Sequence, residues 1–235
     1  MTRVVRALNN GENALLESPT GTGKTLSLLC ASLAWLKNER ERNPVEPKSL
    51  GPNGTPAGLD VPRIIYTSRT HSQLAQVQKE LINTAYNPRS VVIGSRDHFC
   101  IHPQISLLKG FLLNNACKKA MKGLDPCVYS KNREFAKTSM TWEPLDIEEL
   151  HEVGKKGMLC PYFANKDRVT GADIVFMPYN YLIDEKIREN FDIRYENTCI
   201  IFDEAHNVAQ CAEDVTSFEL KSKLLEGVVI ELQKL

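Results

Sequence analysis

A single stretch decides the fold of this chain: Ser18-Pro19-Thr20-Gly21-Thr22-Gly23-Lys24-Thr25. It lies between a short apolar run at 14–16 and a longer apolar segment at 26–36, which predicts a strand, a phosphate-binding loop and a helix. The glycines let the backbone direct successive N–H groups at phosphate oxygens, and the helix N-terminus adds its positive dipole end. Lys24 supplies positive charge for the β- and γ-phosphates, and the Thr25 hydroxyl can coordinate Mg²⁺. We therefore expect residues 18–25 to bind a nucleotide, although Ser18 stands where the general motif has glycine.

Composition limits the possible classes of protein. The chain has 235 residues, 42% of them hydrophobic, which is enough for one large α/β domain with or without an insertion. Lys and Arg (29) balance Asp and Glu (29), so any basic surface for nucleic acid must be local. Seven cysteines without a secretory leader favour reduced thiols or metal ligands, and no run approaches 18 apolar residues. We expect an intracellular protein that is not embedded in a membrane.

Further strands follow the phosphate loop at regular intervals. Buried strands are predicted at 63–67, 90–94, 172–177 and 199–202, with helices over 24–37 and after Gln73. Alternating strands and helices predict a parallel sheet with helices on both faces. Two blocks depart from this rhythm: a Pro- and Gly-rich surface insertion at 38–62, and almost 80 residues between the third and fourth strands.

A second nucleotide element is predicted where the fifth strand ends. The strand delivers Asp203 and Glu204 to the edge of the sheet at which open α/β folds bind ligands. Asp203 would hold Mg²⁺, and Glu204 would orient and deprotonate the attacking water. An Asp-Glu pair after a strand is commonly a solvated turn, but together with a phosphate loop it indicates an ATPase.

Several separate motifs resemble one family. Ser18–Thr25, Tyr66–Gln73 (YTSRTHSQ), Met177–Leu182 (MPYNYL) and Asp203–Asn207 (DEAHN) together resemble the first motor domain of the XPD-like, iron–sulfur DEAH helicases. Gly94–Pro103 (GSRDHFCIHP) and Phe176–Tyr181 (FMPYNY) narrow the resemblance to one subgroup. The similarity covers nearly the whole chain apart from the Pro- and Gly-rich insertion.

The resemblance implies a RecA-like fold and an ATP-driven DNA helicase of 5′→3′ polarity. It implies Lys24, Asp203 and Glu204 as catalytic residues, Thr25 and Asp203 as Mg²⁺ ligands, and His206 in motor coupling. It also implies a nuclear protein of DNA repair, recombination control and telomere maintenance, with single-stranded DNA, junctions or displacement loops as substrates and repair or replication proteins as partners. Such helicases carry a second motor domain that contributes an arginine finger, so we expect this chain alone to bind ATP and hydrolyse it poorly.

Four cysteines lie in the long block before the fourth strand. Cys100, Cys117, Cys127 and Cys160 are separated by 16, 9 and 32 residues, without the paired knuckles of structural zinc sites. From the residues alone, a metal site and four ordinary buried thiols are equally good interpretations of these four cysteines. The resemblance implies a 4Fe-4S cluster on these four thiolates. Cys30, Cys199 and Cys211 fit ordinary packing, and we expect His98 and His102 to be surface residues.

Candidate DNA contacts fall into two groups. Arg69 and Thr70 follow a strand, where they can hold backbone phosphates, although a Thr helix cap is the ordinary alternative. The resemblance places DNA contacts there; Asn180 and Tyr181 are weaker candidates, since such tyrosines often only pack. The segment Cys117–Lys137 is basic with interleaved aromatics, which suits single-stranded DNA, although most charge clusters are solvated faces.

These predictions give a domain plan and three competing functions. The plan is a RecA-like domain at 1–97 and 171–217, an Fe–S insertion at 98–170, and the start of a further helical region at 218–235. The leading function is the ATP-binding part of a helicase. The alternatives are a module that binds nucleotide and DNA without unwinding, and an unrelated phosphate-loop ATPase with a zinc insertion.

Overall fold

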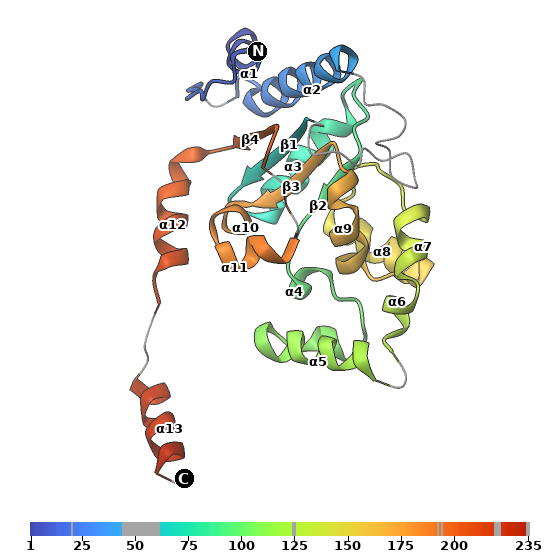
Figure 1. Cartoon of the computed structure of the whole chain (residues 1–235), viewed down its shortest axis with the longest axis vertical. Coiled ribbons are helices and arrows are strands. Elements are labelled where there is room, and N and C mark those ends of the chain that lie inside the picture. Colours follow the sequence, from blue (N-terminus) through green and yellow to red (C-terminus); the bar gives the residue numbers. More distant parts are fainter. Residues whose placement is uncertain are drawn as a thin grey trace.

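The computed structural model describes residues 1–19, 21–43, 62–123, 126–191, 193, 195–218 and 222–233. At its centre is a parallel four-stranded sheet in the order β2-β3-β1-β4 (Figure 1). The strands are β1 (Arg63–Ser68), β2 (Ser90–Val92), β3 (Ile174–Pro178) and β4 (Thr198–Phe202). The α/β class and the parallel sheet predicted from the sequence are confirmed.

Helices connect and flank these strands. They are α1 (Thr2–Asn10), α2 (Lys24–Arg42), α3 (His71–Ile82), α4 (Arg96–Phe99), α5 (Gly110–Lys122), α6 (Val128–Lys131), α7 (Arg133–Ser139), α8 (Ile147–Gly157), α9 (Pro161–Arg168), α10 (Tyr179–Ile183), α11 (Glu185–Arg188), α12 (Val208–Thr216) and α13 (Ser222–Leu232). Helices α4 to α9 all lie in sequence between β2 and β3, so the long predicted block is helical. Figure 1 shows α13 well away from the sheet.

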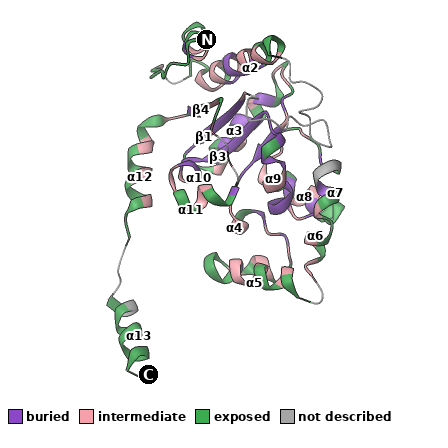
Figure 2. Cartoon of the chain, in the orientation of Figure 1, coloured by how far each residue is buried: buried purple, intermediate pink, exposed green. Residues whose placement is uncertain are grey.

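The core forms around β1 and β3. Every residue of both strands is buried, as expected for parallel strands covered on both faces (Figure 2). Helix α3 packs its predicted apolar face against these strands through Leu74, Val77 and Leu81. Helix α2 packs against α3 and β1 through Leu29, Leu33 and Leu36. This packing holds α2 beside the sheet, so the phosphate loop that precedes α2 also lies next to the strands.

The strand predicted at 14–16 does not form. These residues have no regular structure, and Leu15 is 93% exposed. A strand is stable only when its N–H and C=O groups pair with a neighbour, and the sheet ends at β4. Three apolar residues between polar neighbours do not bury enough surface to hold an unpaired strand in place.

The helix after the phosphate loop is longer than the sequence predicts. It continues to Arg42, beyond the expected end at Lys37, so the first residues of the predicted 38–62 insertion are helical. Ion pairs along its last turns support this extension: Lys37 with Glu41 at 4.0 Å, and Arg42 with Glu39 at 3.3 Å. Residues 44–61, which make up most of the insertion, lie outside the described residues, as does Thr20 of the phosphate loop.

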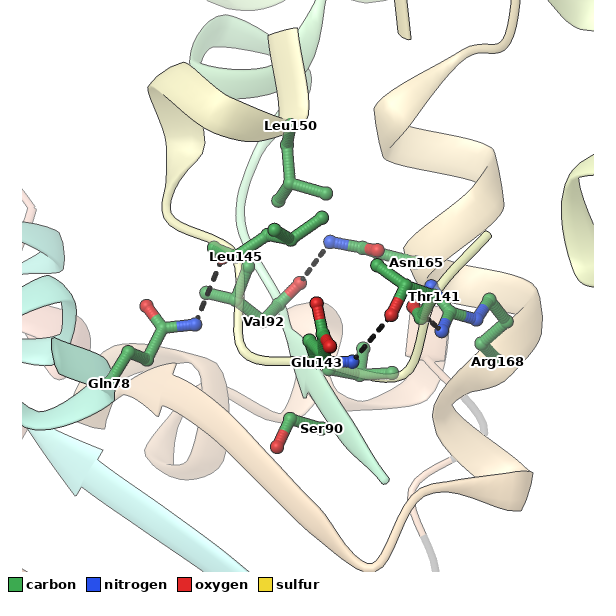
Figure 3. A pocket seen from close by; sticks show the side chains of 10 residues that line it. Gln78, Ser90, Val92, Thr141, Glu143, Leu145, Leu150, Asn165 and Arg168 are labelled. Atoms are coloured by element: carbon green, nitrogen blue, oxygen red, sulfur yellow. Dashed lines mark hydrogen bonds between the residues drawn. The ribbon is translucent and has the colours of Figure 1, made fainter. Parts of the chain in front are cut away.

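Polar side chains join the helical block to the outer edge of β2. Gln78 of α3 donates to the Leu145 carbonyl at 3.0 Å, and Asn165 of α9 donates to the Val92 carbonyl at 2.9 Å (Figure 3). Arg168 donates to the Thr141 carbonyl and lies over the Trp142 ring, 4.1 Å from its centroid. The cavity between them measures about 10 Å³, room for one water molecule. This region is a structural joint rather than a ligand site.

Candidate functional site at the carboxyl edge of the sheet

Three strands end side by side at one edge. In the register of the sheet, Thr67 of β1 lies opposite Met177 of β3 and Phe202 of β4. The segments that follow these strands are Ser68–Thr70, Tyr179–Tyr181 and Asp203–His206. The Asp203 N–H donates to the Thr67 carbonyl at 2.9 Å, which extends the pairing of β4 by one residue. The fold thus brings the predicted acidic pair and the predicted DNA contacts to one place.

The phosphate loop has the backbone that its glycines predict. Gly21 and Gly23 have φ values of 80° and 73°, in the left-handed region that glycine adopts without strain. Gly23 then caps α2, which begins at Lys24. The Thr22 hydroxyl donates to the Pro19 carbonyl at 2.8 Å and also contacts the Ser18 hydroxyl. Ser18 therefore contributes to the shape of the loop at the position where the general motif has glycine.

Lys24 and Glu204 are in contact although 180 residues separate them. The Lys24 Nζ lies 3.3 Å from Glu204 Oε1, with 32% and 37% of the two side chains exposed. A half-exposed ion pair contributes only about 0–1 kcal/mol to stability. Its significance is geometric, because it places the phosphate-binding charge next to the carboxylate predicted to activate water.

Asp203 and Thr25 meet around a buried hydroxyl. Tyr66 is fully buried in β1, and its hydroxyl lies beside both side chains. Burial raises the pKa of Tyr66, and the Asp203 carboxylate raises it further. Within the described part of the chain this hydroxyl makes no hydrogen bond of ordinary geometry. A hydroxyl, a carboxylate and an unsatisfied phenol around one point form a donor set that suits a hydrated Mg²⁺ ion.

Glu204 has an unusual backbone. Its φ of 53° places a non-glycine residue in the left-handed region, at a cost of roughly 1–2 kcal/mol. Its carbonyl accepts hydrogen bonds from the Asn207 main-chain N–H at 3.1 Å and from Asn207 Nδ2 at 3.2 Å. The Tyr179 hydroxyl, which donates to the Asp203 carbonyl, lies 3.2 Å from the same oxygen. Two such bonds, at roughly 0.5–1.5 kcal/mol each, are large enough to offset that cost. His206 Nδ1 lies 3.4 Å from Glu204 Oε2, so the residue predicted for motor coupling touches the catalytic candidate.

Arg69 and Thr70 lie at the start of α3. Thr70 caps this helix: its hydroxyl accepts from the Gln73 N–H at 3.3 Å, and the Gln73 side chain accepts from the Thr70 N–H at 3.1 Å. The ordinary alternative, a helix cap, is therefore present. Arg69 is exposed, and its guanidinium donates to Asn207 Oδ1 at 3.5 Å. A DNA contact at either residue stays a prediction.

Asn180 and Tyr181 lie in the first turn of α10, which begins at Tyr179. Tyr181 is only 6% exposed and packs its ring near Phe191 and His71. Its burial favours the packing alternative over stacking on DNA bases, whereas Asn180 is half-buried at the same edge. His71 in turn lies against His98 of α4, with ring centroids 4.4 Å apart, and this contact joins the start of α3 to the helical block. Burial, and to a smaller extent the neighbouring His98, lowers the pKa of His71 to about 4.

The four cysteines of the helical block are half-buried near one another. Burial raises the pKa of Cys100, and the Cys117 and Cys127 thiols are close enough to raise it further. Burial likewise raises the pKa of Cys160 to about 12, although hydrogen bonds from the backbone N–H groups of Phe163 and Tyr162 act in the opposite direction and lower it. In the described ranges no three His, Cys, Asp or Glu side chains are arranged to hold a metal ion. The Fe–S ligand set therefore stays a prediction.

The basic segment is only partly available for a ligand. Lys118, Lys119 and Lys122 are exposed on α5, and Phe135 is 62% exposed on α7. Arg133, in contrast, pairs with Asp167 and lies over the Phe163 ring. The side chain of Lys137 lies outside the described residues.

Some contributors to this edge were not singled out from the sequence. They are Tyr66, Tyr179 and Asn207. Each stands in or directly after a strand, or next to the acidic pair, and position relative to the strand ends is the signal that could have identified them. Spacing alone does not reveal that their polar atoms converge on Asp203 and Glu204.

Comparison with known proteins gives the class. The DEAD_2 family model matches residues 66–225, and the chain belongs to this family. Among relatives, the regulator of telomere elongation helicase 1 homolog of Drosophila virilis is 42% identical over 247 residues, which cover 94% of this chain and 24% of the relative. The protein of the same name from Arabidopsis thaliana is 41% identical over 251 residues, 100% of this chain and 24% of the relative. The similarity to the regulator of telomere elongation helicase subgroup, indicated by Gly94–Pro103 and Phe176–Tyr181, is thus confirmed.

Solved structures support the fold. One described as "XPD_Helicase" superposes with a TM-score of 0.57 at 21% identity, over 90% of this chain and 32% of that structure. A "Truncated XPD" gives 0.55 at 22% identity, over 90% of this chain and 53% of that structure. This chain spans about a quarter of the length of the relatives named above. None of the helices that the structure describes is long and apolar enough to cross a bilayer.

Proposed function

We propose that this chain is the nucleotide-binding portion of an ATP-dependent DNA helicase. The observation that carries the proposal is the 3.3 Å contact between Lys24 and Glu204, which joins the phosphate loop to the acidic pair. The same sheet edge holds Arg69 and Thr70, so nucleotide and DNA would bind on adjacent segments. Membership of the DEAD_2 family and helicase relatives at about 42% identity support this assignment.

Each residue has a role in this proposal. The Ser18–Gly23 backbone and Lys24 bind the phosphates, while Thr25 and Asp203 hold the Mg²⁺ that neutralises them when bound. Glu204 accepts a proton from the attacking water, and His206 beside it links the pair to motor movement. Arg69 and Thr70 hold DNA phosphates, which positions the strand without reading sequence, and Asn180 and Tyr181 are secondary candidates.

The proposed cellular role rests on the resemblance to XPD-like helicases and, for telomere maintenance, on the relatives' printed names. We propose 5′→3′ movement on single-stranded DNA, with junctions or displacement loops as substrates, in a nuclear protein of telomere maintenance, recombination control and repair. Repair or replication proteins would be its partners. The domain plan, with motor segments at 1–97 and 171–217, an insertion at 98–170 and a following region from 218, belongs to the same proposal.

Nucleotide binding is the first test. We expect the unmodified chain to bind a fluorescent ATP analogue only with Mg²⁺. Lys24→Ala should weaken binding by roughly 30-fold, the loss expected for a charge-assisted contact of about 2 kcal/mol. Lys37→Ala, an exposed lysine of the same helix, is the matched control. Equal affinity in both variants would contradict the assignment of the phosphate site.

We also propose that Cys100, Cys117, Cys127 and Cys160 hold a 4Fe-4S cluster. Their thiols are close enough to influence one another, and backbone N–H groups donate to the Cys100 and Cys160 sulfurs. Such N–H···S bonds stabilise cluster thiolates, and the positive charge of Arg96 beside Cys100 does the same. The donor set therefore suits the group.

Metal analysis tests the cluster. Chain purified without oxygen should contain roughly four iron and four sulfide ions, and Cys117→Ser should lose them. Cys211→Ser, which changes a thiol of α12 outside the helical block, should retain them. Stoichiometric zinc, or metal content unchanged in Cys117→Ser, would refute the proposal.

A further inference from the structure

Tyr179 occupies a fixed position between the strand ends. It is the first residue after β3, is 1% exposed, and packs its ring near Phe202 of β4 with centroids 6.0 Å apart. Its hydroxyl donates to the Asp203 carbonyl and lies 3.2 Å from the Glu204 carbonyl. A phenol held by packing thus contacts the main chain of both acidic residues rather than their carboxylates.

Asn207 holds the same carbonyl from the other side. Its Nδ2 donates to the Glu204 carbonyl at 3.2 Å, and its Oδ1 accepts from Arg69 at 3.5 Å. Glu204 is the residue with the left-handed backbone, so its carbonyl position and the direction of its side chain depend on each other. Two side chains therefore contact the carbonyl whose position is tied to the direction of the Glu204 side chain.

The side chains of Tyr179 and Asn207 both contact the segment Ser68–Thr70, at the end of β1. The Ser68 hydroxyl lies beside the Tyr179 hydroxyl and donates to Gln73 Oε1 at 3.0 Å. Gln73 Oε1 also accepts from the Thr70 N–H at 3.1 Å. One continuous hydrogen-bonded route thus connects Arg69 with the Glu204 main chain through Asn207. A second contact places the Ser68 hydroxyl beside the Tyr179 hydroxyl, which lies against the same main chain.

We propose that Tyr179 is a positioning residue that couples DNA binding at Ser68–Thr70 to the orientation of Glu204. This inference rests on the proposed function, in which Arg69 and Thr70 hold DNA phosphates. A DNA phosphate that draws Arg69 towards it would change the contact between Arg69 and Asn207 and would also move Ser68, the residue before Arg69. The Tyr179 hydroxyl passes that shift to the Glu204 carbonyl, which turns the carboxylate beside Lys24. If DNA changes the affinity for nucleotide by a given factor, linkage requires that nucleotide bound at Lys24 change the affinity for DNA by the same factor.

The test measures directly how much DNA binding changes the affinity for nucleotide. The dissociation constant of a non-hydrolysable fluorescent ATP analogue with Mg²⁺ is measured with and without a saturating 20-nucleotide oligo-dT. The ratio of the two constants is the coupling, and couplings of about 5- to 150-fold are typical of linked sites. We expect Tyr179→Phe, which removes only the hydroxyl, to reduce the ratio to less than about 2-fold while leaving the affinity for each ligand alone nearly unchanged. Tyr86→Phe, a half-buried tyrosine away from this edge, is the matched control.

Thermal unfolding separates coupling from stability, because a purely structural role would lower the melting temperature and leave the ratio intact. If Tyr179→Phe does not fold, Asn207→Ala removes the second donor to the same carbonyl and should lower the ratio likewise. A ratio in Tyr179→Phe equal to that of the unmodified chain overturns the inference, as does a ratio of one in the unmodified chain when both ligands bind. Absence of nucleotide or DNA binding to the unmodified chain overturns the proposed function, and the inference with it.

Discussion

The two edges of the sheet use the same chemistry in opposite ways. At the amino edge, Asp173 lies just before β3 and accepts from Arg40 at 2.8 Å and from the Arg89 guanidinium at 2.6 Å. The Arg89 N–H donates to the same carboxylate at 2.8 Å, and Asp173 is 7% exposed. At the carboxyl edge, Glu204 meets Lys24 through one half-exposed contact from a strained backbone.

The difference separates stability from function. A buried carboxylate that accepts four hydrogen bonds, as Asp173 does from Arg40 and Arg89, holds neighbouring segments together and has little capacity left for a ligand. A half-exposed carboxylate on a left-handed residue adds little stability, but it can exchange its partner for a water or a phosphate. The amino edge therefore supports the sheet, and the carboxyl edge is free to perform chemistry.

The largest expected effect comes from breaking the amino edge. Asp173→Asn leaves two half-buried guanidinium groups without their counter-charge, and removing one partner of a buried pair costs about 3–5 kcal/mol. We expect the free energy of unfolding at pH 7, measured by urea titration, to fall by about 3 kcal/mol. Glu152→Gln, which neutralises an exposed carboxylate paired with Lys156, should change it by less than about 0.5 kcal/mol. Similar losses in both variants would contradict the distinction.

The next largest effect is the increase in the free energy of unfolding when nucleotide binds at the carboxyl edge. Mg²⁺-ATP that binds only the folded chain should raise the free energy of unfolding by about 2.7 kcal/mol at a concentration 100 times the dissociation constant. At the same ligand concentration Lys24→Ala should lose most of this increment, because its affinity is lower. Asp173→Asn should keep the whole increment, since its defect lies at the opposite edge. An increment lost in Asp173→Asn would show that the two edges are not independent.

Acid should weaken the amino edge selectively. Burial alone would raise the pKa of Asp173, but hydrogen bonds from Arg89 and the charge of Arg40 outweigh it and hold the pKa below its usual value of 3.8. The unfolded chain then binds a proton first, so the contribution of Asp173 to stability is full above about pH 4 and declines as pH falls through the folded pKa. We expect the stability gap between the unmodified chain and Asp173→Asn to be equal at pH 7 and pH 5 and smaller at pH 3. A constant gap over this range would refute the pairing.

The sequence predicted the arrangement of strands better than the contacts between them. Gly21, Gly23 and Lys24 predict their own backbone and helix, because local chemistry decides both. The strand at 14–16 failed because a strand depends on a partner, and pairing is not a local property. The end of α2 was placed too early for a related reason: Arg40 is held by Asp173, 133 residues further along the chain.

The candidate site shows the same limit. Asp203 and Glu204 were predicted from a strand followed by two carboxylates, a pattern visible in sequence. Tyr179 was not singled out, because its hydroxyl meets the acidic pair through carbonyls that every residue carries. Convergence of side chains on backbone atoms leaves no trace in residue types, and only the register of β3, β1 and β4 reveals it.

The smallest expected effect completes the comparison. Glu204→Gln keeps the left-handed backbone and the two carbonyl hydrogen bonds, and loses the negative charge that faces Lys24 and His206. The free energy of unfolding should therefore change by less than about 1 kcal/mol, against about 3 kcal/mol for the equivalent change at Asp173. Urea titration of both variants in one buffer measures the contrast. If Glu204→Gln destabilised the chain as much as Asp173→Asn, the carboxyl edge would also support the fold, and its exposed carboxylate would not be free to accept a proton from water.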